Sequence, residues 1–173
     1  MQRQISVCRF FYFMNNKKNC YILIITFLVS FASDIAVKLL ALRFLKHKTD
    51  IIPGFFSLDL SFNYGAAFGI LDGQKWLFIL FFAVLFIAVM SYREKLLKSP
   101  ALSAAFGLVL GGGLGNIIDR LALVPKNCVT DYLDFHIKAS EKLLSYPCFN
   151  LADMCIVSGC ILIILLYKRT GGK

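Results

Sequence analysis

The side chains that could do chemistry in this sequence lie beside or within long apolar segments. Asp34 and Lys38 interrupt the first such segment, Asp119 follows the third, and Asp153 falls early in the fourth. A charged side chain at the centre of a bilayer costs roughly 2.5 kcal/mol or more, so those that persist are usually paired or face a polar cavity. A functional site is therefore expected at these positions.

Two helical spacings group several of these residues. Asp34 and Lys38 are four residues apart, which places them on one helical face and predicts a structural ion pair. Asn116, Asp119 and Arg120 also share one face, at spacings of three and four. We expect Asp119 to be held ionised by the adjacent Arg120 and to form an orienting salt bridge with it, a role that does not move protons.

Further acids stand before and within the fourth apolar segment. Asn150 and Asp153 share a helical face in the motif FNLAD, one turn inside the segment. An Asp near a helix N-terminus is also favoured by the macrodipole alone, so this segment by itself leaves a structural role open. Asp131 and Asp134, in VTDYLDF, are predicted to lie in an outer loop, where either could be a solvated acid.

The spacing of the histidines and cysteines gives little support for a metal site. The two histidines, His47 and His136, have no HExxH or other metal-ligand spacing. The six cysteines show no spacing suited to zinc, and a Cys128–Cys148 bridge in an oxidising compartment stays open. We expect no metal and no cofactor.

A pair of carboxylates is the chemistry that remains. A Ser–Lys dyad needs a neutral lysine, yet Lys38 has Asp34 one turn before it, and no GxSxG motif occurs. Two close aspartates share one proton, so that one can deprotonate water while the other protonates the substrate, as in aspartic peptidases. Spacing leaves four candidates for the pair, Asp119, Asp131, Asp134 and Asp153.

The elements that must position these residues are mainly membrane helices. Of the 173 residues 58% are hydrophobic and 17% are charged, whereas soluble domains carry about a quarter charged residues. Each of four apolar segments is near the ~20 residues that cross the bilayer, and they are residues 21–40, 76–91, 101–118 and 149–167. We expect one integral membrane domain, residues 1–173, with all-α architecture apart from a small sheet.

That sheet is predicted at residues 50–72, where partial alternation, aromatic and β-branched residues and bend glycines favour short strands. The third apolar segment carries Gly107, Gly111 and Gly115 at intervals of four. Small residues spaced in this way form a ridge that lets another helix approach closely.

Positive charge orients the chain. Lys and Arg fill 10 of the 34 positions in residues 1–20, 92–99 and 168–173, but 8 of the 62 in residues 42–75 and 120–147. The denser set is expected in the cytoplasm, with both termini. The net charge of +9 then reflects topology and anionic lipid headgroups, and no nucleic-acid partner is expected. All the polar candidates fall at or beyond the outer ends of the segments.

Five motifs occur in one order between residues 20 and 167: SDIAVK, FNYGAAFGIL, GGGLGNIIDRL, VTDYLDF and FNLAD. In these motifs the chain resembles the lipoprotein signal peptidases, also called signal peptidase II. The resemblance implies four transmembrane helices with an extracytoplasmic β-cradle in the bacterial inner membrane. It also implies a monomer whose partners are membrane lipids and prolipoproteins, which it cleaves before a diacylglyceryl-modified cysteine.

The resemblance also implies a choice among the acids: Asp131 and Asp153 become the catalytic pair. Residues implied or expected to support the site are Asn63, Asn116, Arg120, Asn150, Asp34, Lys38 and Asp119. The chain departs from the family pattern at Tyr132, where Phe or Met is common, and in a longer extension before Tyr21. Two alternatives remain, a transporter or channel subunit and an inactive lipoprotein-binding relative. A transporter is expected to carry its polar groups near the midplane.

Overall fold

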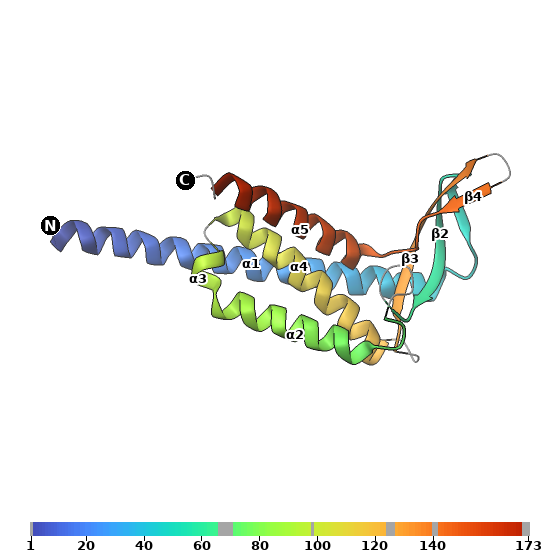
Figure 1. Ribbon diagram of the computed structural model, residues 1–173, viewed down its shortest axis with the longest axis horizontal. Helices are drawn as coiled ribbons and strands as arrows, with labels where there is room; N and C mark the ends of the chain where they lie inside the picture. Colours follow the sequence, from blue (N-terminus) through green and yellow to red (C-terminus); the bar gives the residue numbers. More distant parts are fainter. Residues whose placement is uncertain (1, 66–70, 98, 124–126, 140–141, 171–173) are drawn as a thin grey trace.

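The computed structural model describes residues 2–65, 71–97, 99–123, 127–139 and 142–170. It is mostly helical, with a small antiparallel sheet at one end (Figure 1). The helices are α1 (Gln2–Phe44), α2 (Lys75–Ser91), α3 (Arg93–Leu96), α4 (Pro100–Ile118), the π-helix η2 (Asp119–Leu123) and α5 (Leu151–Thr170). The strands are β1 (Thr49–Ile52), β2 (Phe56–Asn63), β3 (Val129–Ala139) and β4 (Lys142–Ser145). The beginning of α1 and the end of α5 lie opposite the sheet (Figure 1).

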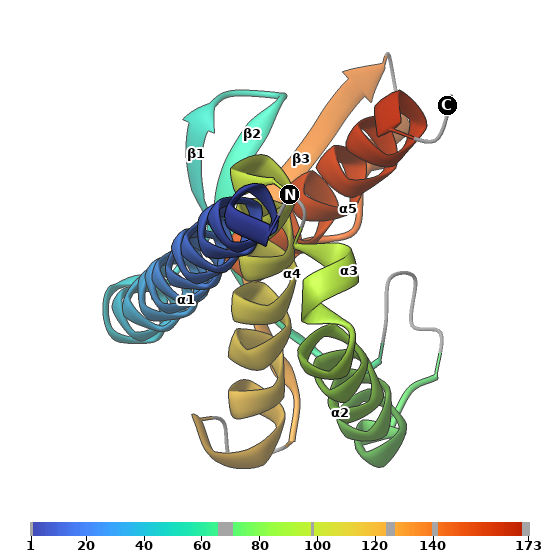
Figure 2. The ribbon, with the colours of Figure 1, turned by 90° about the vertical axis from the view of Figure 1, so that its left-hand side faces the viewer.

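Helix α4 is the central element and packs against α1, α5 and α2 (Figure 2). It begins with Ser99, whose hydroxyl caps the Leu102 N–H at 3.2 Å, followed by Pro100, a favoured first helical residue. A Cβ added to Gly107 would lie 2.8 Å from the Leu23 carbonyl oxygen of α1. The glycine ridge therefore brings the backbones of α4 and α1 into close contact, as predicted.

The four predicted apolar segments lie in helices, but the ends of these helices differ from the predicted ends. Two helical segments, Lys17–Phe44 and Pro100–Leu123, are long and apolar enough to cross a membrane, and two apolar helices, Lys75–Ser91 and Leu151–Tyr167, are shorter. Phe149, placed in the fourth segment, instead forms an antiparallel bridge with Leu133 before α5 begins.

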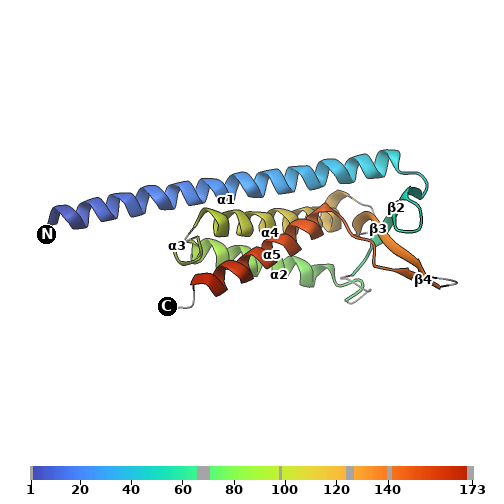
Figure 3. The same cartoon turned by 90° about the horizontal axis from the view of Figure 1, so that it is seen from above.

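Helix α1 begins at Gln2, well before residue 21, and extends past the other helices (Figure 3). Its 43 residues contain no Gly or Pro, so no residue interrupts the helix. At about 1.5 Å per residue such a helix is about 65 Å long, roughly twice the thickness of the hydrocarbon core.

The sheet has the order β1-β2-β3-β4. Pro53 and Gly54 turn the chain between β1 and β2, and Gly54 has the positive φ of 76° that a type II turn requires. The strand prediction for residues 50–72 is confirmed in β1 and β2, while residues 66–70 lie outside the described residues.

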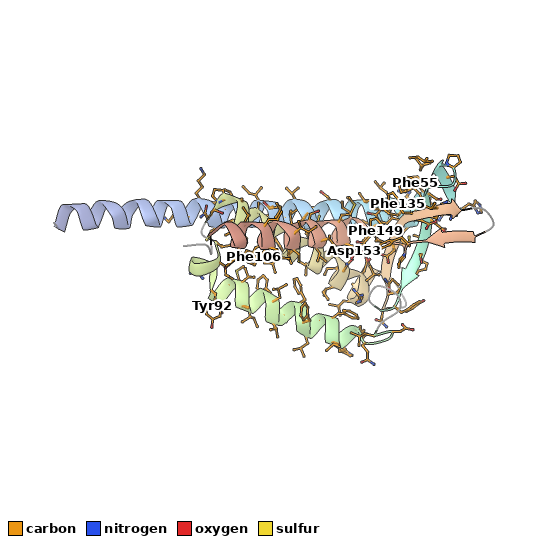
Figure 4. All side chains as sticks on the ribbon, turned by 45° about the horizontal axis from the view of Figure 1, so that its top comes forward. Phe55, Tyr92, Phe106, Phe135, Phe149 and Asp153 are labelled. Carbon is orange, nitrogen blue, oxygen red and sulfur yellow. The ribbon has the colours of Figure 1, made fainter. Side chains whose placement is uncertain are left out.

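The outer loop predicted around Asp131 and Asp134 is wrong, because both residues lie on strand β3. Asp131 pairs with Ser61 of β2 and Asp134 with Ser57. Acids disfavour strands locally, but tertiary contacts outweigh that preference here. The ring of Phe135 lies 4.6 Å from that of Phe56 and 5.7 Å from that of Phe149, measured between centroids (Figure 4). The Cys128–Cys148 bridge that the sequence left open is not formed, because neither cysteine is part of a disulfide.

Candidate active site

Residues from four elements meet where the helices join the sheet. Asp131 comes from β3, Asp153 from the first turn of α5 (Figure 4), Asn63 from the end of β2, and Asn116 from the last turn of α4. All four line one cavity of about 560 Å³, as does Arg120 of η2. The fold thus gathers residues that are up to 90 positions apart in the sequence.

Asn150 and Asp153 form a reciprocal cap at the beginning of α5. The Asp153 N–H donates to Asn150 Oδ1 at 3.0 Å, and the Asn150 N–H donates to Asp153 Oδ2 at 3.2 Å. This is the geometry of a capping box, in which two helix N–H groups find side-chain acceptors. Asp153 therefore caps the helix, which is the structural role that its position near the helix N-terminus suggested. Its other carboxyl oxygen, Oδ1, accepts a hydrogen bond from Asn116.

Three asparagine amides hold the two carboxyl groups. Asn150 Nδ2 donates to Asp131 Oδ1 at 2.6 Å, and Asn63 Nδ2 donates to Asp131 Oδ2 at 3.1 Å. Asn116 Nδ2 donates to Asp153 Oδ1 at 2.8 Å. Since Asn150 contacts Asp131 with its side chain and Asp153 with its backbone, one residue bridges both acids.

Behind these amides lies a fully buried ion triad. Lys38 Nζ lies 2.8 Å from Asp34 Oδ2 and 3.1 Å from Asp119 Oδ2, and all three side chains have 0% exposure. The same ammonium donates to Asn116 Oδ1 at 2.9 Å. Because this oxygen is taken by Lys38, the Asn116 amide nitrogen points toward Asp153. The predicted Asp34–Lys38 pair is confirmed, and it orients a cavity-lining amide.

The expected pairing of Asp119 with Arg120 is wrong. Asp119 contacts Lys38 and accepts the Thr130 N–H at 2.8 Å. Arg120 instead donates to the Gly65 carbonyl at 2.7 Å, and its guanidinium lies 4.3 Å from the centroid of the Phe78 ring. Adjacent residues on a helix point in different directions, so neighbours in sequence do not face each other.

Burial sets the electrostatics of Asp131, which is 1% exposed. Burial, followed by the nearby charge of Asp153, raises the pKa of the Asp131 carboxyl from 3.8 to about 7, although the hydrogen bonds from Asn63 and Asn150 lower it. The carboxyl can consequently hold a proton near neutral pH. That property suits a pair of acids that exchange one proton.

Away from the acids, the cavity is lined mostly by apolar side chains. They come from α2, α4 and α5 and include Phe78, Phe81, Phe82, Leu85, Val89, Phe106, Val109, Leu110, Ile156, Val157 and Ile163. The cavity follows η2 and α4 from Arg120 back to Phe106, which at about 1.5 Å per residue is about 20 Å. Such a cavity can hold an extended apolar chain with its polar end beside the carboxyl groups.

Asp134, the remaining acidic candidate, lies apart from the residues that line this cavity. Its Oδ2 is 2.5 Å from Lys48 Nζ and 3.3 Å from His136 Nδ1. The Asp134 carboxylate thus connects the segment before β1 to β3. This contact is structural, since it joins β3 to the segment that leads into β1.

Sequence reasoning missed contacts at the beginning of α5. Asp34 Oδ1 accepts the Ala152 N–H at 3.0 Å, and the Tyr132 hydroxyl accepts the Leu151 N–H at 3.1 Å. Backbone donors leave no trace in a sequence pattern. The signal that existed was the departure at Tyr132 from the Phe or Met common in the family.

Comparison with known proteins shows the family to which the chain belongs. The family model described as Signal peptidase (SPase) II matches residues 25–168. The chain is 39% identical to the lipoprotein signal peptidase of Symbiobacterium thermophilum, covering 77% of this chain and 86% of that protein. It is also 39% identical to the lipoprotein signal peptidase of Halothermothrix orenii, covering 82% and 91%.

A solved structure of a membrane enzyme has a similar fold. The chain superposes on a bacterial membrane enzyme solved by the in meso method at 2.3 Å resolution, with a TM-score of 0.71 and 28% identity, covering 87% of this chain and 91% of that one. The match extends over the helices and the sheet together. The chain therefore belongs to the signal peptidase II family and is an aspartic peptidase of the membrane.

Proposed function

We propose that this enzyme removes the signal peptide from prolipoproteins, cleaving on the N-terminal side of the diacylglyceryl-modified cysteine. Its relatives carry the name lipoprotein signal peptidase. The observation that carries the proposal is the position of two carboxyl groups, Asp131 and Asp153, in the wall of a mainly apolar cavity. A peptide with a lipid attached at the cleavage site has this combination of apolar and polar parts.

Asp131 and Asp153 act as a pair that shares one proton. The ionised carboxylate takes a proton from a water molecule, whose oxygen adds to the scissile carbonyl carbon. The protonated carboxyl gives its proton to the carbonyl oxygen. When the tetrahedral intermediate breaks down, the C–N bond cleaves and the leaving nitrogen receives the proton taken from the water. The second carboxylate takes a proton back from a hydroxyl of the intermediate, which leaves a carboxyl product and restores the shared proton of the pair. The raised pKa of Asp131 supports this cycle near neutral pH.

The other residues position the pair and the substrate. Asn63, Asn116 and Asn150 orient the carboxyl groups. Arg120, in the cavity wall, is placed to donate to a substrate carbonyl. The buried residues that hold these in place are Asp34, Lys38 and Asp119. The apolar stretch of the cavity accommodates acyl chains of the substrate.

For the membrane we propose four crossings, by α1, α2, α4 and α5, in a single domain of residues 1–173. The apolar parts of α2 and α5, Lys75–Ser91 and Leu151–Tyr167, are shorter than the usual ~20-residue crossing. The local bilayer can thin to match them, or neighbouring helices can complete the crossing. Both termini lie in the cytoplasm. The sheet and the aspartate pair lie on the outer side of the inner membrane. The enzyme works as a monomer in contact with lipid.

The first test replaces each acid of the pair. Asp131→Asn and Asp153→Asn should each lower cleavage of a diacylated prolipoprotein by the purified enzyme at least about 10³-fold, because the amide cannot transfer the proton. The measurement is a gel-shift assay in detergent. Asp72→Asn, at an exposed acid, is the matched control and should retain full activity. More than a few per cent of activity in either variant would remove that residue from the pair.

A further inference from the structure

Tyr132 makes a contact that a Phe or Met side chain in its place could not make. It directly follows Asp131 on β3, and its side chain is buried, with 5% exposure. Its hydroxyl oxygen accepts the Leu151 N–H at 3.1 Å, and its backbone N–H donates to the Phe149 carbonyl at 3.1 Å. Tyr132 thus connects β3 to the chain at both sides of Asn150.

The Leu151 N–H belongs to the first turn of α5. The first N–H groups of a helix have no acceptor within the helix and need one from elsewhere. Here the N–H groups of Asn150, Ala152 and Asp153 bond to side chains of the site. The Tyr132 hydroxyl completes the set, so that every leading N–H of the helix that carries Asp153 is held by a side chain.

We infer that the Tyr132 hydroxyl is a positioning group that sets the separation of the two carboxyl groups by tying β3 to the first turn of α5. Asp131 lies one residue before Tyr132, and Asp153 lies two residues after Leu151. The hydrogen bond therefore closes a short path between the two acids. This inference rests on the proposed function, in which these acids share a proton.

The hydroxyl acts on the rate through the separation of the acids. If α5 moves away from β3, the repulsion between the two carboxylates weakens and the doubly ionised state forms at lower pH. The other charged groups around the pair have contacts outside α5 that Tyr132 does not make. Lys38 of α1 holds Asp34 of α1 and Asp119 of η2, and Arg120 of η2 donates to the Gly65 carbonyl. A change in separation then appears in the pH profile of cleavage.

The test is Tyr132→Phe, which removes one oxygen atom and keeps the ring. Loss of one buried hydrogen bond should lower kcat about five-fold, with KM unchanged. The alkaline limb of the pH profile should move about half a unit toward lower pH. Amide hydrogen exchange at Leu151 should become about ten-fold faster, because its N–H loses its acceptor.

The matched control is Tyr92→Phe, at a residue that is 57% exposed and lies at the opposite end of the helices from Asp153 (Figure 4). It should leave all three measurements unchanged. An equal loss of rate at every pH in Tyr132→Phe would indicate a smaller folded fraction and overturn the inference, as would unchanged kinetics. In both cases cleavage by the parent enzyme leaves the proposed function standing. A parent that does not cleave overturns both.

Discussion

At the scale of single residues, neutral amides surround the acids of the pair. Asn63 and Asn150 donate to Asp131, and Asn116 donates to Asp153. A cation in direct contact would lower the pKa of a carboxyl by stabilising its charge. The Lys38 ammonium contacts Asn116 instead. The amides thus fix the geometry of the carboxyl groups and leave the raised pKa of Asp131 in place.

The pH dependence of cleavage follows from this arrangement. We expect a bell-shaped rate profile, since the proposed mechanism needs one shared proton on the pair. The acid limb reports full protonation of the pair and the alkaline limb reports loss of the shared proton. Because burial raises the pKa of Asp131 to about 7, the alkaline limb should lie near neutral pH. Initial cleavage rates across pH measure both limbs.

Asp134→Asn is the control for this profile. Asp134 is paired with Lys48 and stands apart from the cavity, so its replacement should change neither limb. A rate that stays level from mildly acid to strongly alkaline pH in the parent would contradict the shared proton. Loss of the bell in Asp134→Asn would transfer the role to that acid.

At the scale of elements, close helix packing brings the buried charges to the site. Gly107, Gly111 and Gly115 of α4 all face α1, and a Cβ at Gly112 would lie 2.5 Å from the Ala152 carbonyl of α5. Small residues allow such close approach between helices in a membrane. Because α1 lies close to α4, Lys38 reaches Asn116. Because α5 also lies close to α4, Asp153 lies beside Asn116.

Two glycines of α4 allow a matched test of this packing. At Gly107 an added methyl group would meet the Leu23 carbonyl, which is backbone and cannot move aside. At Gly113 it would meet the Phe82 ring at 2.9 Å, and a side chain can shift. Both changes gain the same helix propensity, so Gly107→Ala should be less stable than Gly113→Ala by about 1 to 3 kcal/mol. Unfolding in detergent measures this difference, and equal stabilities would contradict backbone contact between α1 and α4.

At the scale of the whole molecule, the sheet lies at one end, and the beginning of α1 and the end of α5 lie at the other (Figure 1). Asp131, on β3, and Asp153, in the first turn of α5, lie where the helices join the sheet. An exported substrate must meet the acids on the outer side of the membrane. The proposed orientation meets this need, since the regions richer in Lys and Arg are the N-terminal segment, residues 92–99 and the C-terminal segment.

Reporter fusions test that orientation. A reporter fused after Lys173 or within residues 92–99 should be active in the cytoplasm. A reporter within residues 122–127 should be active on the outer side of the membrane, because the proposed crossing by α4 lies between residues 92–99 and residues 122–127. Activity-matched reporter pairs in whole cells provide the measurement. A cytoplasmic signal at residues 122–127 would place the acids on the wrong side for exported substrates.

The sequence by itself determined the class of molecule and its family, and it predicted the membership of the site. Hydrophobicity and helix spacing are properties of neighbouring residues, so the apolar segments and the Asp34–Lys38 pair could be predicted from them. The motif order brought Asp131, Asp153 and the asparagines together as one group. The structure places Asp131, Asp153, Asn63 and Asn116 around one cavity, with Asn150 in contact with both acids. The catalytic role of the two acids stays a prediction for the Asn variants to test.

Only the tertiary structure decided the partners within that site. Asp119 stands next to Arg120 in the chain but bonds to Lys38, which lies 81 positions away in the sequence. Asp131 lies on a strand because β2 and the aromatic rings near Phe135 stabilise β3, against the local preference of its acids. The position of β3 in the sheet also brings the Tyr132 hydroxyl to the Leu151 N–H at the beginning of α5. Partner choice depends on which surfaces the packed helices and the sheet bring together, and that depends on contacts between residues distant in the sequence.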